Sequence, residues 1–340
     1  MSLRQKLRIR SRLRSGVRSI FPPGPKPLIL MYHRVADEPV DPWGLAVSSA
    51  HFEEQLHVLR RVRHPFPLTD FVRNLIAGTL PPNAVALTFD DGYVDNLHVA
   101  KPRLTAADIP ATVFLATGYL NGSRKFWWDK LERLILFGTA PKEFEFAVRS
   151  RALRCDIGTE PPVHGRVIGP LPTSNKRHSA LIKIWLILRR LNDTEREPIL
   201  DTLASFLTVP DLPTSPARIM SADEVATIAA DGLVTVGAHT VTHPVLPTLE
   251  TAACRREIVE SKATCEALTG KPVSTFAYPF GEFDPKSREE VQNAGFAIAC
   301  STSDRPVQAA SDVLALPRVY VPSVDGNAFE KTLRMISAAT

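Results

Sequence analysis

The sequence predicts an α/β protein in which the strands of a mainly parallel sheet alternate with helices. Apolar runs of six or seven residues recur along the chain, and amphipathic segments with a helical period lie between several of them. Glycine follows two of these helical segments, at Gly232 and Gly270, where it favours a helix end. This alternation is typical of βα units, which form either an open doubly wound sheet or a barrel. The apolar periodicity does not distinguish an open sheet from a barrel.

The apolar runs are the predicted strands. They cover residues 27–33, 84–89, 111–117, 233–239, 274–279, 296–301 and 315–321. Helices are expected over 48–62, with Ser49 as its N-cap, over 221–232 and over 252–270. The second of these opens with a capping box, Ser221 and Glu224, in which each side chain satisfies a backbone N–H of the first turn.

The alternation stops between residues 120 and 220. This region is expected to hold an aromatic amphipathic segment at 126–138, a hairpin at 143–157, and helices at 178–192 and 195–207. We interpret it as a mostly helical insertion that lies over one face of the sheet and shapes substrate access. Trp127 and Trp128 are expected to anchor it, and sugar stacking is the alternative. The remaining divisions are a basic tail at 1–24, one interrupted domain at 25–322, and a C-terminal helix or tail at 323–340.

Composition and charge exclude several classes of protein. A chain of 340 residues with 44% hydrophobic and 23% charged residues can bury a sizeable core, so disorder and coiled coil are excluded. The net charge is +5, but residues 1–20 hold seven of the 41 Lys and Arg residues and no acid. The rest of the chain is therefore nearly neutral, which argues against a nucleic-acid partner.

The expected location is cytoplasmic. Residues 1–20 lack the apolar core of a secretory signal, and no run of ~20 apolar residues is long enough to span a bilayer. Cys155, Cys254, Cys265 and Cys300 are widely spaced and indicate reduced thiols rather than a disulfide framework. The basic segment predicts either a solvated tail or a peripheral helix on the inner membrane face, and an organelle transit peptide remains open.

The stretch ALTFDDGYVDN, residues 86–96, places two carboxylates side by side where a buried strand ends. Adjacent acids repel each other, and a divalent cation relieves that repulsion. Consecutive residues of an extended segment point to opposite sides. One carboxylate can therefore bind a metal while its neighbour accepts a proton.

The stretch GAHTVTHPV provides two further ligands at the end of another predicted strand. His239 and His243 are four residues apart, so that a turn can bring both imidazoles to one point. Two imidazoles and one distant carboxylate leave a coordination position open for water, as in catalytic zinc sites.

These motifs resemble those of the polysaccharide deacetylases, carbohydrate esterase family 4, which include the chitooligosaccharide deacetylases. TFDDGY at 88–93 and HTVTHP at 239–244 are similar to the first two motifs, and FAYPFG at 276–281 is similar to the third. The resemblance covers roughly 25–118 and 218–322. It implies a distorted (β/α) barrel of about seven parallel strands and a metal-dependent removal of N-acetyl groups from amino sugars.

The resemblance also implies roles for individual residues. Asp91, His239 and His243 match the metal ligands, and Asp90 matches the catalytic base. The backbone N–H of Tyr93 matches the donor to the oxyanion. Zn²⁺ is the expected metal, with Co²⁺, Ni²⁺ or Fe²⁺ as alternatives.

The chain departs from the family's pattern at two points. Ala277 stands where many members have an arginine that orients the base, and no histidine follows the leucine near the C-terminus. A proton donor must still reach the leaving amine. We expect His33, in LMYHRV, to act as this acid; the alternative is a structural histidine that caps the strand or pairs with Asp37 or Glu38.

Four residues are expected to face the substrate. Tyr278, Pro279 and Phe280 resemble a wall that contacts a sugar, although core packing explains an aromatic residue beside proline equally well. Arg318 is also expected to contact the substrate. The alternatives are that it forms an ion pair with Asp90, in place of the absent arginine, or a surface salt bridge.

The sequence therefore predicts a metal-dependent hydrolase that removes an N-acetyl or other short N-acyl group from an amino sugar in a glycan, glycolipid or saccharide. The alternatives are a sugar deformylase on the same scaffold and a glycan-binding protein that retains the metal without catalysis. A metallophosphoesterase fits less well, because two-metal sites need more ligands than this sequence offers.

Overall fold

A computed structural model describes residues 24–38, 40–120, 125–139, 143–149, 151–158, 175–209 and 217–338. Its main element is a sheet of eight strands in which every pairing is parallel. The strands are β1 (Leu28–Tyr32), β4 (His64–Pro65), β5 (Ala84–Phe89), β6 (Ala111–Leu115), β9 (Val234–Ala238), β10 (Thr275–Ala277), β11 (Ile298–Cys300) and β12 (Val319–Tyr320). All seven predicted strands are present, and most are shorter than their apolar runs.

The order of the strands shows that the sheet winds in one direction. From one edge it runs β11-β10-β9-β6-β5-β1-β12, and β4 pairs with β5 beside this path. An isolated parallel bridge joins Cys300 to Leu316, three residues before β12, so the last segment contacts both β11 and β1. The backbone N–H of Ser301 donates to Leu316, and that of Leu316 donates to Ala299. The sheet is therefore a distorted, nearly closed barrel rather than a doubly wound sheet.

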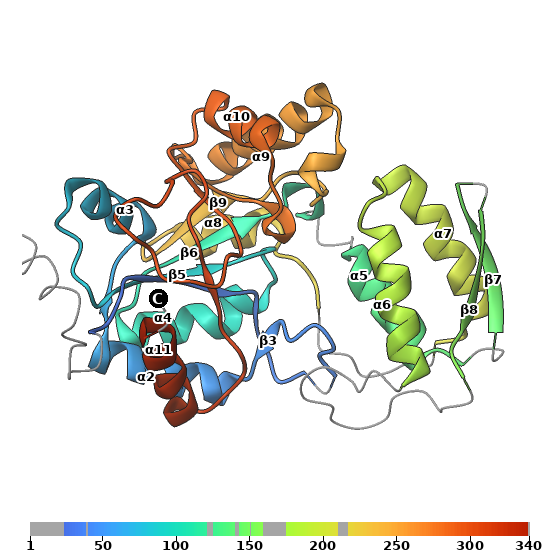
Figure 1. Ribbon diagram of the computed structural model, residues 1–340, viewed down its shortest axis with the longest axis horizontal. Helices are drawn as coiled ribbons and strands as arrows, with labels where there is room; N and C mark the ends of the chain where they lie inside the picture. The colour runs from blue at the N-terminus through green and yellow to red at the C-terminus, as the bar shows by residue number, and fades with distance from the viewer. Residues whose placement is uncertain are drawn as a thin grey trace, which may run out of the picture.

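Helices cover the outside of this barrel (Figure 1). They are α2 (Ser49–Val62), α3 (Leu68–Ala77), α4 (Lys101–Ala107), α8 (Ala222–Ala229), α9 (Thr251–Thr269), α10 (Pro285–Asn293) and α11 (Gly326–Ala338). The predicted capping box of α8 is confirmed, and Gly270 ends α9 in the left-handed conformation. The predicted cap of α2 was one residue off. Ser48 is the N-cap, because its hydroxyl accepts from the backbone N–H of His51.

The insertion packs largely on itself. Its elements are α5 (Trp127–Glu132), the π-helical turn η3 (Arg133–Phe137), the hairpin β7 (Glu143–Val148) and β8 (Arg151–Asp156), α6 (Lys176–Leu188) and α7 (Asp193–Phe206). Figure 1 shows them grouped at one side of the molecule. The expectation that they lie over a face of the sheet is wrong: they lie beyond the carboxyl ends of the strands, and α5 and α6 contribute walls of the cavity described below.

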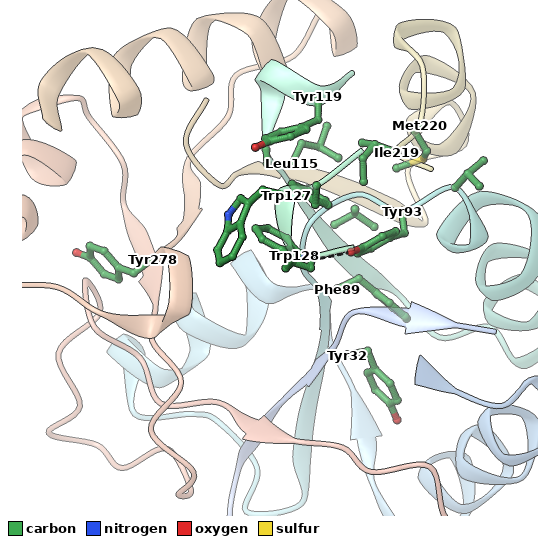
Figure 2. Close-up of a cluster of buried hydrophobic side chains, with 14 of the residues drawn as sticks. Tyr32, Phe89, Tyr93, Leu115, Tyr119, Trp127, Trp128, Ile219, Met220 and Tyr278 are labelled. Carbon is green, nitrogen blue, oxygen red and sulfur yellow. Dashed lines mark hydrogen bonds between the residues drawn. The ribbon is translucent and has the colours of Figure 1, made fainter. Parts of the chain in front are cut away.

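Aromatic side chains fill the space between the sheet and its surroundings. Tyr32 stacks on Phe89 at 5.3 Å between ring centroids and meets Phe52 edge-on at 5.4 Å. Figure 2 shows this cluster continuing past Tyr93 to Trp127 and Trp128 of the insertion. The barrel and the insertion therefore share one apolar core. The four cysteines are free and buried.

Within the described residues, no helix has the length and apolarity to cross a bilayer. The prediction of a basic membrane-surface helix concerns residues 1–20, which lie outside the described part of the chain.

A substitution in β9 tests the packing between β9 and its two neighbouring strands. A Cβ atom on Gly237 would lie 2.4 Å from the ring of Phe114 and 2.6 Å from Thr275 Oγ1. We expect Gly237→Ala to lower the free energy of unfolding by about 1–3 kcal/mol through overpacking. Chemical denaturation measures the change. Gly24→Ala, with no atom within 4 Å of its added Cβ, is the control, and equal stabilities of the two variants would contradict this packing.

Candidate active site

The two adjacent aspartates lie in a tight turn at the end of β5. The backbone N–H of Asp90 still pairs with Tyr32, but Asp91 and Gly92 follow with φ angles of 74° and 78°. A Cβ on Gly92 would lie 2.6 Å from Leu115, so glycine is required there for space as well as conformation. The expected alternation of an extended chain is wrong at this point. The turn directs both carboxylates into the same cavity.

The two histidines lie on a strained loop after β9. The backbone N–H of His239 extends the pairing with β6 to Leu115, after which Thr240 and His243 adopt φ angles of 66° and 55°. Such angles are unfavourable for residues other than glycine and persist only where surrounding contacts hold them. They fold the loop back so that both rings reach one point.

Glu257 of α9 holds this loop in place. Its carboxylate accepts the backbone N–H groups of Val241 and Thr242 at 2.8 Å each, and the Thr242 hydroxyl at 2.7 Å. The hydroxyl of Thr240 accepts the N–H of His243 at 3.0 Å. Sequence reasoning missed Glu257, because a helical glutamate that acts through backbone groups has no motif of its own.

Asp91, His239 and His243 converge within the barrel mouth. One ligand atom from each lies within 4.8 Å of the other two, and all three side chains are buried. Asp91 Oδ1 is 3.8 Å from His239 Nε2 and 3.5 Å from His243 Nε2, and the two Nε2 atoms are 3.1 Å apart. Tetrahedral zinc with bonds of about 2.0–2.2 Å separates its ligands by roughly 3.3 Å. The observed separations bracket that value.

The donor chemistry of the three side chains also fits a cation. His239 Nδ1 lies 2.7 Å from the carbonyl oxygen of Ala277, which only accepts, so Nδ1 carries the hydrogen and Nε2 presents its lone pair. Asp91 Oδ1 is buried and has no hydrogen-bond donor among the described residues. Burial, followed by the charge of Asp90, raises the pKa of Asp91 well above its usual value. A divalent cation would offset both effects.

Asp90 is held by Arg318, which lies just before β12. The guanidinium donates to both carboxylate oxygens at 2.6 and 2.7 Å, and its Nε donates to the carbonyl of Ser301 at 2.9 Å. Burial alone would raise the pKa of Asp90, but the charge and hydrogen bonds of Arg318 hold it well below its usual range. The expectation that Arg318 contacts substrate is wrong, because its side chain is fully buried behind Asp90. The ion pair with Asp90, the alternative considered for Arg318, is the contact that the structure shows.

His33 lines the same cavity on the other side of Asp90. Its Nε2 is 4.0 Å from Asp90 Oδ2. Burial lowers the pKa of His33 to about 4, and the attraction of Asp90 offsets this only in part. The imidazole is therefore neutral at pH 7. Among the described residues, neither Asp37 nor Glu38 pairs with His33; Asp37 accepts from the Ser49 hydroxyl, and Glu38 forms an ion pair with Arg34.

Tyr93 connects the aspartate turn to the insertion. Its hydroxyl accepts from the indole N–H of Trp128 at 3.0 Å (Figure 2) and donates to the carboxylate of Asp129, whose oxygens lie at 3.1 and 3.2 Å. Burial raises the pKa of Asp129 to about 7. Tyr93 and Ile219 form an isolated antiparallel bridge. Its two hydrogen bonds are made by the residues on either side of Tyr93 and Ile219, so the backbone N–H of Tyr93 takes no part in the bridge.

The expected sugar-facing wall is only partly present. Phe280 lines the cavity, but Tyr278 is fully buried, donates to the carbonyl of Leu314 at 2.9 Å, and lies apart from the aspartate turn (Figure 2). Pro279 is also buried and does not line the cavity. For these two residues core packing is the correct alternative, because both are buried and neither lines the cavity.

The cavity has a volume of about 230 Å³. Besides Phe280 and the polar groups above, the lining consists of Trp43, Leu45, Trp128, Trp185 and Thr302. Sequence reasoning missed Trp43 and Trp185, because neither lies in a motif and both reach the site only through the tertiary fold. Trp128 anchors the insertion as expected and also lines the cavity, whereas Trp127 is buried behind it.

Loss of the Glu257 carboxylate tests its role as the support of the histidine loop. We expect Glu257→Ala to weaken metal binding about 10–100-fold, because the ligands lose their orientation while remaining present. Chelator competition measures the affinity. Glu260→Ala, an exposed site on the same helix, is the matched control. Unchanged affinity in Glu257→Ala would show that the loop holds its shape without this contact.

Removal of the Arg318 charge tests the ion pair beneath the site. We expect Arg318→Met to lower the free energy of unfolding by about 3–5 kcal/mol, because Asp90 is left buried and unpaired. The double variant Arg318→Met, Asp90→Asn should recover part of this loss, since the uncompensated charge is gone. Denaturant titrations of both variants measure these changes. An Arg318→Met variant as stable as the native chain would contradict a stabilising role of the ion pair.

Comparison with known proteins agrees with this geometry. The family model described as polysaccharide deacetylase matches residues 77–140 and 199–299, which include the aspartate turn and the histidine loop. Among curated proteins, none matches the chain significantly.

Several solved structures share the fold along most of its length. The deacetylase PplD of Streptococcus pyogenes, in complex with acetate, is 17% identical, with a TM-score of 0.57 over 92% of this chain and 99% of that one. IcaB from Ammonifex degensii is 19% identical, with a TM-score of 0.55 over 93% and 99%. A de-N-acetylase from Aggregatibacter actinomycetemcomitans is 14% identical, with a TM-score of 0.55 over 90% and 99%. The family model matches 165 of the 340 residues and the solved structures share the barrel fold, so this chain is similar to the polysaccharide deacetylases in both sequence and fold.

Proposed function

We propose that this chain is a metal-dependent hydrolase that removes N-acetyl groups from an amino sugar in a glycan, glycolipid or saccharide. The observation that carries the proposal is the convergence of Asp91, His239 and His243 beside an ionised Asp90 in one cavity. Three ligands leave coordination positions open, which is the catalytic rather than the structural arrangement.

Asp91, His239 and His243 would hold the metal. Two imidazoles and one carboxylate suit Zn²⁺, and Co²⁺, Ni²⁺ or Fe²⁺ can occupy a site of the same type. The ion, when bound, supplies a Lewis acid that polarises an amide carbonyl and makes water more acidic. The resemblance of the deacetylase motifs and the distances between these ligand atoms support the assignment.

Asp90 acts as the general base in this proposal. Arg318 keeps the carboxylate ionised, so it is ready to accept a proton from the attacking water. The ion pair also fixes the carboxylate plane, because the bidentate contact allows one orientation. The backbone N–H of Tyr93 would donate to the oxygen that becomes negative during attack, and Trp128 and Asp129 hold its ring.

His33 is the proposed proton donor to the leaving amine. It lines the cavity, and its Nε2 lies 4.0 Å from Asp90, which is longer than a hydrogen bond, so the two groups must move closer during the reaction before a proton accepted by Asp90 is passed on. Because its resting pKa is about 4, His33 must gain this proton during the reaction rather than carry it beforehand. Transfer of this proton to the leaving amine returns His33 to its neutral form.

The alternatives predict different products. A deformylase on the same scaffold releases formate instead of acetate, and a catalytically inactive glycan-binding protein binds metal and saccharide but releases neither. A panel of N-acetylated and N-formylated amino sugars separates all three, with released acid measured directly.

Substitution of the base tests the mechanism. We expect Asp90→Asn to lower kcat by at least about 100-fold, because the amide cannot accept the proton of water, while metal binding persists. Acetate release and metal content are measured on the same preparation. Asp325→Asn, an acidic residue at the start of α11, is the control. Full hydrolysis by the Asp90 variant would exclude it as the base.

A further inference from the structure

Aromatic rings from three separate segments form a continuous wall around the cavity. Trp43 comes from the loop before α2, Trp185 from helix α6 of the insertion, and Phe280 from the turn after β10. The Trp43 and Trp185 rings are 5.2 Å apart, and the Trp185 and Phe280 rings are 5.7 Å apart. Phe280 in turn meets the ring of His243 at 4.6 Å. We call Trp43, Trp185 and Phe280 the aromatic arc.

Arg189 contacts two of the three rings of the aromatic arc. The guanidinium of Arg189 lies 4.7 Å from the Trp185 ring and 4.5 Å from the Phe280 ring, and it forms an ion pair with Glu282. Cation–π contacts of a largely buried arginine stabilise the positions of both rings. The insertion is therefore attached to the turn after β10 through these contacts.

The size of the cavity limits what it can hold. Its volume of about 230 Å³ is below the roughly 300–1,000 Å³ of pockets that take drug-sized ligands, so it has room for about one sugar ring with its acyl group. An internal unit of a polymer needs two exits, one for each neighbour along the chain. The contacts of the aromatic arc close the side between the loop before α2, the insertion and the turn after β10.

We infer that this chain deacetylates a terminal N-acylated amino sugar unit, and that Trp43 and Trp185 exclude internal units. The inference rests on the proposed function and specifies its substrate class. The terminal ring enters with its acyl group toward Asp91, His239 and His243, and its apolar face lies against the indole rings. The rest of the glycan, or any other group attached to that sugar, stays outside the open side of the cavity.

The test uses fully N-acetylated glucosamine and galactosamine oligomers of two to six units, with mass spectrometry to locate each lost acetyl group. We expect the native protein to remove at least ten acetyl groups from terminal units for each one removed from an internal unit. Trp185→Ala and Trp43→Ala should lower this ratio at least fivefold, because each opens the aromatic arc. Leu186→Ala, an exposed site on the same helix outside the lining, should leave it unchanged.

The outcomes separate this inference from the proposed function. Equal loss of terminal and internal acetyl groups by the native protein would overturn the inference and leave the deacetylase proposal standing. An unchanged ratio in both tryptophan variants, with their thermal unfolding like that of the native chain, would remove the assigned role of the aromatic arc. Absence of acetate from every oligomer, despite bound metal, would overturn the proposed function and the inference with it.

Discussion

The ion pair between Arg318 and Asp90 connects the chemistry of this protein to the closure of its barrel. Arg318 lies 228 positions after Asp90, immediately before β12, the strand that brings the end of the domain beside β1. Both side chains are buried, so either one alone would leave an uncompensated charge in the interior. The pair can form only when β12 has docked. Ionisation of Asp90, the proposed base, therefore depends on completion of the fold.

Backbone strain is concentrated where ligands must converge. Asp91, Thr240 and His243 adopt positive φ angles, and each lies within two residues of a strand end or a ligand. Such conformations are unfavourable in isolation and are retained because Glu257, Leu115 and the neighbouring strands hold the loops. The rigid sheet thus provides the support, and the short loops at its carboxyl edge aim the side chains.

The insertion changes an open barrel mouth into a bounded cavity. It contributes Trp128 and Trp185 to the lining, and Asp129 and Trp128 contact the hydroxyl of Tyr93. One set of its contacts therefore holds the aspartate turn, and another bounds the cavity. Helix α5 takes part in both, because Trp128 lines the cavity while Trp128 and Asp129 contact Tyr93.

The sequence alone determined the strands, the capping box at Ser221 and the ligand motifs, because apolar period, cap chemistry and short-range spacing are local properties. It also indicated that Asp91 and His239 follow strands, which in a parallel sheet end at one edge. Only the tertiary structure decided what Arg318 and Tyr278 contact, that Glu257 supports the histidine loop, and that Trp43 meets Trp185. These are contacts between side chains far apart in the chain, and their geometry depends on how the whole barrel closes, which no local pattern encodes.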